Sequence, residues 1–282
     1  MIGLDWSEVA RVVDAALAED IGRGDITSAV AVPEHARGDF TINARQPMVV
    51  AGIDVAAYVF RDYVPDCEVE LFVSDGDHVD KGAALARVRG PGRALLTCER
   101  TALNLLQFMC AVATYANSFA KAIEGTGAVM IDTRKTIPGL RELSKYAVRI
   151  GGVRNHRMRL DDGVLIKDNH IAIAGGVRQA VEGVKMKTPL LTKIEVEVDT
   201  LEQLREAIDA GADLIMLDNM GPDMMREAVR ITAGRVPLEA SGGITLQSVR
   251  AAAETGVNFI SSGRITQSPP AVDIGLDVRL DI

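Results

Sequence analysis

Residues 194–218 read IEVEVDTLEQLREAIDAGADLIMLD, and this stretch decides the fold. It begins with a short apolar segment, continues with an amphipathic helical pattern over 201–210, and ends with a second apolar segment at 214–218. Gly211 follows the helical pattern, where a glycine suits the left-handed conformation that ends a helix before a strand. The stretch therefore predicts a strand, a helix and a second strand that runs parallel to the first.

The same rhythm of apolar segment and helical pattern recurs across the second half of the chain. The apolar segments start at Val129, Gly163, Ile194, Leu214, Pro237 and Phe259. The last four starts are 20, 23 and 22 residues apart, as expected for repeated strand–helix units. The repeat predicts a parallel α/β barrel or a doubly wound sheet. Six strands are fewer than the eight of a closed barrel, so we expect an incomplete barrel.

The first half of the chain follows other patterns. Residues 1–20 have the period of an amphipathic helix, with Asp5 placed as its N-cap. Alternating apolar and polar residues between 40 and 88 predict β-rich structure with one helix near 55–60. A dense apolar pattern over 98–124 predicts a long helix at the junction between two domains.

The composition limits the classes of function. The 282 residues carry a formal net charge of −8, and an acidic surface repels a nucleic-acid backbone. The three cysteines lack metal-site spacing and are odd in number, which favours a reducing compartment over a disulfide framework. The N-terminal segment has neither the layout of a signal peptide nor the length of a membrane span. We therefore expect a soluble cytoplasmic protein that binds neither nucleic acid nor membrane.

One stretch, residues 134–167, opposes the acidic balance of the chain. It holds nine Lys or Arg and three Asp or Glu, so its local charge is 9 − 3 = +6 and the remainder carries −14. A basic cluster within an acidic protein indicates a pocket for a small, highly charged anion. A solvated basic helix is the alternative, but Gly151-Gly152 and Asn155-His156-Arg157 interrupt the helical pattern.

Polar residues and glycines gather where the predicted strands of the second half end. They are Asp132-Thr133-Arg134-Lys135, Lys167-Asp168-Asn169, Glu195 with Glu197, Asp218-Asn219, Ser241-Gly242-Gly243 and Ser261-Ser262-Gly263. The strands of a parallel barrel all end at one face, and the active site lies on that face. The sequence therefore predicts that these groups converge on one rim.

The residue types at this rim indicate what it binds. Glycines in the last two loops let backbone N–H groups approach phosphate oxygens. Glu197 and Asp218 suit sugar hydroxyls or a hydrated Mg²⁺ ion. His156 suits an anion as a hydrogen-bond donor. Four further basic residues suit carboxylates through charge-assisted bonds; they are Arg134, Lys135, Arg157 and Lys167.

Two charged residues have a structural interpretation from the pattern alone. Glu195 shares a strand face with Glu197, so we expect only Glu197 to reach a ligand and Glu195 to be satisfied inside the barrel. Arg100 follows Glu99 in the first turn of the predicted long helix, which favours a surface salt bridge.

Several motifs follow one another along nearly the whole chain. They are EDIGRGDITS, ERTALNLLQ, DTRKTIPGLR, NHR, VLIKDNHI, IEVEVDT, LDNM, EASGGIT and an SxGxxTxS pattern that ends at Ser268. Several of them are seven residues or longer, which makes the match specific. On these motifs the chain resembles the quinolinate phosphoribosyltransferases, type II phosphoribosyltransferases also called carboxylating nicotinate-nucleotide pyrophosphorylases.

The resemblance implies a fold, a reaction and an assembly. The fold is α/β, with an N-terminal α/β sandwich-like domain over 1–112, an incomplete parallel α/β barrel over 113–269, and a tail, 270–282, that packs back on the first domain. The reaction joins quinolinate to phosphoribosyl pyrophosphate with Mg²⁺ and yields nicotinate mononucleotide, pyrophosphate and CO₂ in de novo NAD biosynthesis. The assembly is a homodimer or a higher homo-oligomer.

The resemblance also implies roles for single residues. The implied substrate-binding residues are Arg100, Thr133, Arg134, Lys135, His156, Arg157, Lys167, Glu197, Asp218, Ser241, Gly242, Gly243, Ser262, Gly263 and Arg264. The implied catalytic residues are Lys135, Lys167, Glu197 and Asp218, of which the two acids hold Mg²⁺ through water. Arg100 is implied to reach the site of the neighbouring subunit, which replaces the salt-bridge interpretation.

Two departures from the family pattern and two alternative functions stay open. The family usually has a third glycine before the NHR motif, where this chain has Gly151-Gly152-Val153-Arg154, and Arg264 replaces a residue that is usually small. One alternative is a related molybdenum-associated enzyme, against which the complete set of quinolinate-binding residues argues. The other is a non-catalytic regulator that binds a pyridine nucleotide or phosphate, against which Glu197 and Asp218 argue.

Overall fold

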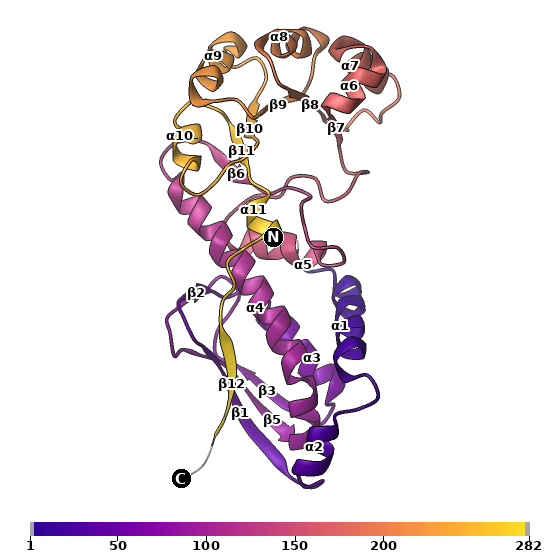
Figure 1. Ribbon diagram of the computed structural model, residues 1–282, viewed down its shortest axis with the longest axis vertical. Helices are drawn as coiled ribbons and strands as arrows, with labels where there is room; N and C mark the ends of the chain where they lie inside the picture. The colour runs from indigo at the N-terminus through magenta and orange to yellow at the C-terminus, as the bar shows by residue number, and fades with distance from the viewer. Residues whose placement is uncertain (1–2, 280–282) are drawn as a thin grey trace. The chain divides into compact units, whose positions relative to one another are not determined.

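The computed structural model describes residues 3–279 and divides them into two compact units. The first unit comprises residues 3–117, 137–152 and 268–279, and the second comprises 118–136 and 153–267. Figure 1 shows the helices and strands of both units, coloured along the chain. Among the described residues, none of the helices combines the length and the apolar character that crossing a membrane requires.

The first unit is built on a four-stranded antiparallel sheet. Its order is β12 (Ile274–Val278), β1 (Arg37–Ala44), β5 (Ala84–Pro91) and β3 (Glu68–Leu71). A separate pair joins β2 (Met48–Val49) to β4 (His78–Val79). Phe40, Ile42 and Ala44 are buried and alternate with less buried residues, as the sequence pattern predicts for β1. Strand β12 belongs to the predicted C-terminal tail, whose last residues, 280–282, lie outside the described residues.

Five helices belong wholly or mainly to the first unit. They are α1 (Trp6–Ile21), α2 (Ile26–Ala31), α3 (Ile53–Tyr63), α4 (Gly92–Ala122) and α5 (Arg141–Ile150). The Asp5 carboxylate accepts a hydrogen bond from the Ser7 backbone N–H, so Asp5 caps α1 as its position predicts. Helix α4 begins at Gly92 rather than at residue 98, directly after β5 ends at Pro91.

Helix α5 differs from the sequence-based expectation in two ways. It lies in the range predicted for the barrel, 113–269, but its residues cluster with the first unit. Lys145 is one of the nine basic residues of the stretch 134–167 and is not among the four expected to bind carboxylates; it is on this helix and is fully buried. Leu143, Ser144, Ala147 and Val148 are buried as well, so the buried arc of this helix is wider than its apolar face and includes Lys145.

The second unit is a six-stranded parallel sheet with helices between its strands. The sheet order is β6 (Val129–Ile131), β11 (Phe259–Ser261), β10 (Leu238–Ser241), β9 (Leu214–Asp218), β8 (Ile194–Val198) and β7 (Val164–Ile166). The helices are α6 (Asp168–Ala174), α7 (Val177–Lys185), α8 (Leu201–Ala210), α9 (Pro222–Thr232), α10 (Val249–Ala253) and α11 (Arg264–Gln267). Thr200 and Gln203 form a capping box on α8, and Gly211 ends the helix in the left-handed conformation.

All six predicted strands are present, and the predicted fold class is confirmed. The sheet leaves β6 and β7 as its two edges, as an incomplete barrel requires. Arg154 forms a parallel bridge with Ile131 of β6, so the chain after α5 extends this edge. This extension carries residues 155–157 toward the strand ends of the second unit.

Candidate active site

A cavity of about 510 Å³ lies at the carboxyl ends of the strands of the second unit. Its lining consists of Thr133, Arg134, Lys135, His156, Arg157, Leu165, Lys167, Glu197, Met216, Asp218, Asn219, Glu239, Ser241, Gly242, Gly243 and Ser261. These residues come from the ends of all six parallel strands and from the segment after Arg154. The cavity thus occupies the face on which barrel enzymes carry their active sites.

Alternation along the strands decides which side chains reach the cavity. In the parallel register of β9 and β10, Met216 lies opposite Glu239 and Asp218 lies opposite Ser241. Glu197 of β8 lies opposite Met216 on the other side. Residues two apart on a strand share a face, and all five line the cavity. One face of the sheet therefore supplies the acidic and hydroxyl groups of the site.

Four basic side chains line the same cavity, namely Arg134, Lys135, Arg157 and Lys167. The Nε atom of Arg134 is buried and has no hydrogen-bond partner in the described part of the chain, so an anion would satisfy it. Arg157 donates through Nη1 to the Gly163 carbonyl oxygen at 2.8 Å. Burial lowers the pKa of Arg157, and the charge of Arg134 lowers it further. Two guanidinium groups that repel each other in a cavity favour a bound anion.

Two carboxylates, Glu197 and Asp218, complete the charge pattern of the cavity. The Lys167 Nζ atom lies 3.2 Å from Glu197 Oε2. Burial raises the pKa of Glu197, Lys167 opposes this, and Asp218 adds to it. Burial also raises the pKa of Asp218, whose carboxylate accepts a hydrogen bond from the Asn219 side chain. Partly buried acids that raise the pKa of their neighbours are stabilised by a cation, so this donor set fits a hydrated Mg²⁺.

The loop after β10 has a backbone that only glycine tolerates. Gly242 has φ +88°, and a Cβ atom there would lie 2.3 Å from Asn219 Oδ1 and 2.6 Å from Asn219 N. Gly243 follows in the same region with φ +62°. Successive backbone N–H groups in such a turn form a concave site for an anion. The loop packs directly against Asn219, the neighbour of Asp218.

The loop after β11 places its serines on opposite sides. Ser261 lines the cavity, and its hydroxyl donates to Ser241 Oγ at 3.1 Å. Ser262 is only 3% exposed, and its hydroxyl donates to the Ile244 carbonyl oxygen at 2.8 Å. The structure therefore brings Ser261, rather than the predicted Ser262, to the cavity.

The next two residues of this loop also lie outside the cavity lining. Gly263 packs against the Lys135 side chain, because a Cβ atom on Gly263 would lie 2.6 Å from the Cδ atom of Lys135. Thr266 donates to the Lys135 carbonyl oxygen at 2.8 Å. Arg264 begins the short helix α11 and is exposed. This segment supports Lys135 without lining the cavity itself.

Arg100 is the remaining predicted site residue. It lies on helix α4 with a side chain that is 58% exposed, and its Nη2 atom is 4.0 Å from Glu99 Oε1. It is not among the residues that line the cavity in the described part of the chain. An exposed ion pair at this distance contributes little to stability, which leaves the guanidinium available for another contact.

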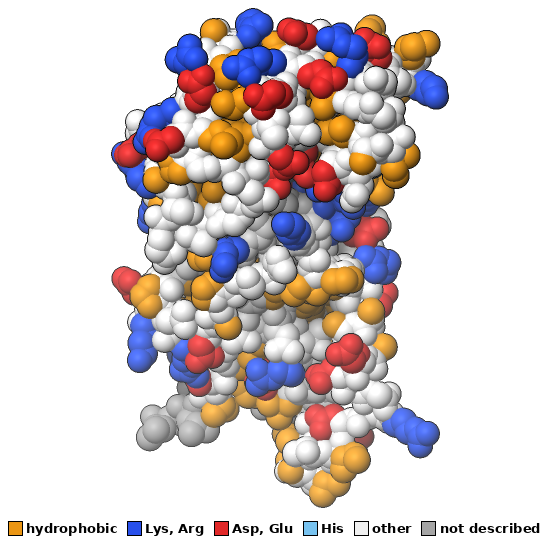
Figure 2. Space-filling view, turned by 45° about the horizontal axis from the view of Figure 1, so that its top comes forward, with side chains coloured by type: hydrophobic (Ala, Val, Ile, Leu, Met, Phe, Trp, Pro, Cys, Tyr) orange, Lys and Arg blue, Asp and Glu red, His pale blue; other side chains and the backbone are white. Residues whose placement is uncertain are grey.

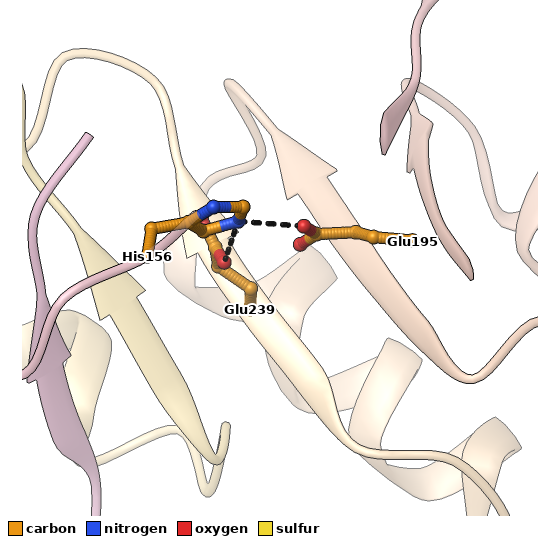
Figure 3. A group of neighbouring side chains, drawn as sticks. All are labelled: His156, Glu195 and Glu239. Atoms are coloured by element: carbon orange, nitrogen blue, oxygen red, sulfur yellow. Dashed lines mark hydrogen bonds and ion pairs between the residues drawn. The ribbon is translucent and has the colours of Figure 1, made fainter. Parts of the chain in front are cut away.

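A buried cluster of His156, Glu195 and Glu239 borders the cavity (Figure 3). The Nε2 atom of His156 lies 2.7 Å from Glu195 Oε2 and 3.7 Å from Glu239 Oε2. Burial raises the pKa of both acids, to about 7 for Glu195. The sequence did not single out Glu239, although it lies two residues before Ser241 on the same strand face, which is the signal that identifies it.

The surface elsewhere does not carry one sign of charge. Figure 2 shows basic and acidic side chains interspersed on the visible face. A long polyanion follows an extended basic surface, whereas a small anion needs only a local cluster of cations. The cationic cavity therefore suits a small, charged ligand.

Two family models match the chain over most of its length. The model of the quinolinate phosphoribosyl transferase N-terminal domain matches residues 25–110, and that of the C-terminal domain matches residues 112–277. Together they cover both the antiparallel sheet of the first unit and the site of the second.

Relatives and solved structures agree with these matches. A probable carboxylating nicotinate-nucleotide pyrophosphorylase of Bacillus subtilis is 44% identical over 93% of this chain and 90% of its own. A chloroplastic one of rice, Oryza sativa, is 39% identical over 98% of this chain and 79% of its own. The structure of the nicotinate-nucleotide pyrophosphorylase from Francisella tularensis superposes with a TM-score of 0.93 at 41% identity, over 98% of both chains. That from Ehrlichia chaffeensis gives 0.92 at 38% identity, over 96% of this chain and 98% of its own.

Proposed function

Because the chain belongs to the quinolinate phosphoribosyltransferase family, we propose that it catalyses the reaction of that family. It joins quinolinate to phosphoribosyl pyrophosphate and releases nicotinate mononucleotide, pyrophosphate and CO₂ for NAD biosynthesis. The observation that carries the proposal is one cavity that combines four cations, two partly buried carboxylates and a left-handed glycine turn.

The cations are suited to the two carboxylates of quinolinate. Arg134 offers a buried Nε–H that no group among the described residues accepts, and burial and then the charge of Arg134 lower the pKa of Arg157. A dicarboxylate relieves the repulsion between the two guanidinium groups through charge-assisted hydrogen bonds. Lys135 and Lys167 line the same cavity and add positive charge near the reacting atoms. These contacts aim the ring nitrogen at the ribose.

The acids and the glycine loop are suited to phosphoribosyl pyrophosphate. Glu197 and Asp218 face the cavity from adjacent strands, where they can bind ribose hydroxyls. The backbone N–H groups of Gly242 and Gly243 suit phosphate oxygens. The same two acids would hold Mg²⁺ through water, and the ion would neutralise the pyrophosphate group.

The chemistry then needs no further cofactor. The ring nitrogen attacks the anomeric carbon, the bond from that carbon to the pyrophosphate oxygen breaks, and pyrophosphate leaves with the electron pair. Holding the two reactants in line lowers the barrier by up to roughly 7–11 kcal/mol. The glycosylated nitrogen is positively charged, so it stabilises the carbanion that remains when the adjacent carboxylate leaves as CO₂. A proton then replaces the lost carboxylate.

Arg100 and the cysteines support two finer proposals. The exposed Arg100 guanidinium, whose Nη2 atom is 4.0 Å from Glu99 Oε1, reaches the cavity of a second copy of the chain in a homodimer or larger homo-oligomer.

Cys67, Cys98 and Cys110 are free thiols, which suits a reducing cytoplasm.

The test is a substrate assay on the purified protein. With quinolinate, phosphoribosyl pyrophosphate and Mg²⁺, we expect equal amounts of nicotinate mononucleotide and CO₂. Nicotinate in place of quinolinate is the matched control, since it can form the nucleotide but lacks the carboxylate beside the ring nitrogen that would leave as CO₂. No turnover of quinolinate, or better turnover of nicotinate, would overturn the proposal.

A Lys167→Ala variant tests the site separately from the reaction. Lys167 lines the cavity, and its Nζ atom lies 3.2 Å from Glu197 Oε2. Its loss therefore removes a positive charge that would contact the substrate and that also lies beside the carboxylates of Glu197 and Asp218. We expect kcat/KM to fall about 100-fold or more. Full activity of this variant would contradict the site map while leaving the overall reaction in place.

A further inference from the structure

Both ring nitrogens of His156 are engaged by the protein. The backbone N–H of Arg157 donates to His156 Nδ1 at 2.7 Å. The Nε2 atom lies 2.7 Å from Glu195 Oε2, as Figure 3 shows. Both ring nitrogens therefore have partners within the protein, and a ring held in this way has no nitrogen left to donate to a ligand.

These two contacts fix where the ring proton is. A backbone N–H can only donate, so Nδ1 accepts and carries no proton. The proton of the ring is therefore on Nε2, which donates it to Glu195 Oε2. His156 is thus a neutral imidazole, and it adds no positive charge to the cavity.

The same argument decides against a metal ion in this cluster. His156 Nε2 and one carboxylate oxygen each of Glu195 and Glu239 lie within 4.8 Å of one another, which is a spacing that could hold an ion. A metal ligand needs an unprotonated nitrogen, with the other nitrogen donating its N–H outward. In this ring the unprotonated nitrogen is Nδ1, which faces Arg157 N–H and not the carboxylates.

Glu239 completes the environment of the ring. Its side chain is 0% exposed, and within residues 3–279 its oxygens accept no hydrogen bond from a nitrogen donor, the His156 Nε2 atom being 3.7 Å away. Burial first, and then Glu195, raise the pKa of Glu239 well above its ordinary value. Glu195 is therefore the carboxylate that holds the Nε2 atom of the ring.

The backbone around His156 is anchored on the other side as well. Asp132 is 0% exposed and accepts from the His156 N–H at 2.7 Å and from the Asn155 side chain at 2.7 Å. The ring then holds the next peptide group, that of Arg157. The chain is therefore fixed at two successive N–H groups just before the Arg157 side chain leaves for the cavity.

We propose that His156 is a neutral positioning residue, held by Glu195 in its Nε2–H form so that its ring fixes the Arg157 backbone. The proposal rests on the proposed function for the identity of the ligand, since it assigns quinolinate recognition to Arg157 and not to His156. It replaces the role of anion donor that the sequence predicted for His156. The ring offers the cavity its carbon surface instead of a charge.

The first test is the protonation state of the ring, which needs no turnover. The chain has 4 histidines, so ¹⁵N-histidine labelling gives a small set of signals, and a His156→Asn variant identifies those of His156. Near pH 7 we expect a protonated Nε2 and an unprotonated Nδ1. Protonation of both nitrogens, or an unprotonated Nε2, would overturn the proposal even if the enzyme turns over quinolinate.

The second test compares two truncations of the ring. His156→Asn keeps an acceptor oxygen near the place of Nδ1, whereas His156→Ala keeps none. We expect the KM for quinolinate to rise about 10- to 100-fold in the Ala variant, and by less than about fivefold in the Asn variant, with the KM for phosphoribosyl pyrophosphate unchanged in both. If His156 acted as a cation, both variants would lose quinolinate affinity equally, and that result would overturn the proposal.

Discussion

The loops after β10 and β11 have similar sequences and different positions in the site. Ser241-Gly242-Gly243 lines the cavity throughout, whereas Ser261-Ser262-Gly263 contributes only Ser261. Ala240 lies opposite Ile260 in the parallel register, so the next residues, Ser241 and Ser261, are equivalent. The family resemblance implies a substrate contact for Ser262, whereas the serine of this loop that lines the cavity is Ser261. A shift of one residue moves a side chain to the other face of a strand.

This difference shows that one loop contacts the cavity and the other supports it. Gly242 is essential because its backbone closes against Asn219, next to the acid Asp218. At Gly263 the absence of a Cβ atom leaves room for the Lys135 side chain, which passes over it. The glycines of the two similar motifs thus pack against different groups: Gly242 packs against the Asn219 backbone, and Gly263 packs against the flexible Lys135 side chain.

The largest effect is expected from Gly242→Ala. The new Cβ atom would meet the Asn219 backbone nitrogen at 2.6 Å, and φ of +88° is strained for any residue with a side chain. We expect kcat/KM for phosphoribosyl pyrophosphate to fall about 100-fold or more, because the loop and Asp218 must shift. Unfolding in denaturant should show a loss of at least about 2 kcal/mol.

Gly234→Ala is the matched control for that variant. Gly234 has a similar left-handed φ of +74°, but its Cβ atom would meet no atom within 4 Å, and it lies outside the cavity lining. It should lose only about 1–2 kcal/mol of stability and keep its activity. Equal kinetic losses in both variants would mean that general strain, and not the loop geometry, causes the effect.

A smaller loss is expected from Gly263→Ala, because the atom that must give way is on a flexible side chain. The new Cβ atom would lie 2.6 Å from Lys135 Cδ, so Lys135 must leave its present position. We expect kcat/KM to fall about tenfold with little change in stability, as measured by steady-state kinetics and thermal unfolding.

A double-mutant cycle with Lys135→Ala shows whether the loss acts through Lys135. If Gly263 only supports Lys135, the second substitution adds almost nothing to the effect of Lys135→Ala alone. Additive losses would indicate instead that Gly263 has a contact of its own with the substrate. That outcome would remove the contrast between the two loops.

Much of the fold followed from the sequence because strand and helix periods are local properties. The six apolar segments became β6 to β11, and Gly211 ended α8 as its position indicated. The burial of Lys145 did not follow, because the pattern of α5 states which residues share a face but not what covers that face. The grouping of α5 with the first unit is likewise a long-range property that local spacing does not contain.

The site was predictable to the extent that its residues stand at strand ends. Arg134, Lys167, Glu197 and Asp218 all line the cavity, as the alternation and the motifs indicated. The states of the side chains were not predictable, because they depend on single hydrogen bonds between distant strands. His156 is the example: Glu195 and the Arg157 amide decide the position of its proton, and no spacing rule gives that.

Ser262→Ala tests the supporting role of the second loop at a hydroxyl. The Ser262 Oγ atom donates to the Ile244 carbonyl oxygen inside the protein, so its loss leaves one buried acceptor without this donor. We expect about 1 kcal/mol less stability and kcat/KM within about twofold of the parent. Ser261→Ala, one residue earlier, is the control in the cavity and should reduce kcat/KM more than it reduces stability. The opposite order would indicate that Ser262 contacts the substrate after all.

The smallest effect is expected from Arg264→Ala. Arg264 is exposed on a helix of four residues and lies outside the cavity lining, although the family resemblance implies a phosphate contact for it. If the loop only supports Lys135, the KM of the variant for phosphoribosyl pyrophosphate differs from that of the parent by less than about twofold. An exposed side chain that does not contact the substrate contributes little to binding or to stability. A direct contact to phosphate would instead raise this KM about tenfold or more. In that case the KM of the Arg264→Ala variant would also depend less on salt than the KM of the parent, since the variant has lost one charge pair that salt screens. Measuring the KM at two ionic strengths therefore separates a supporting loop from a binding loop, even where the change at one ionic strength is small.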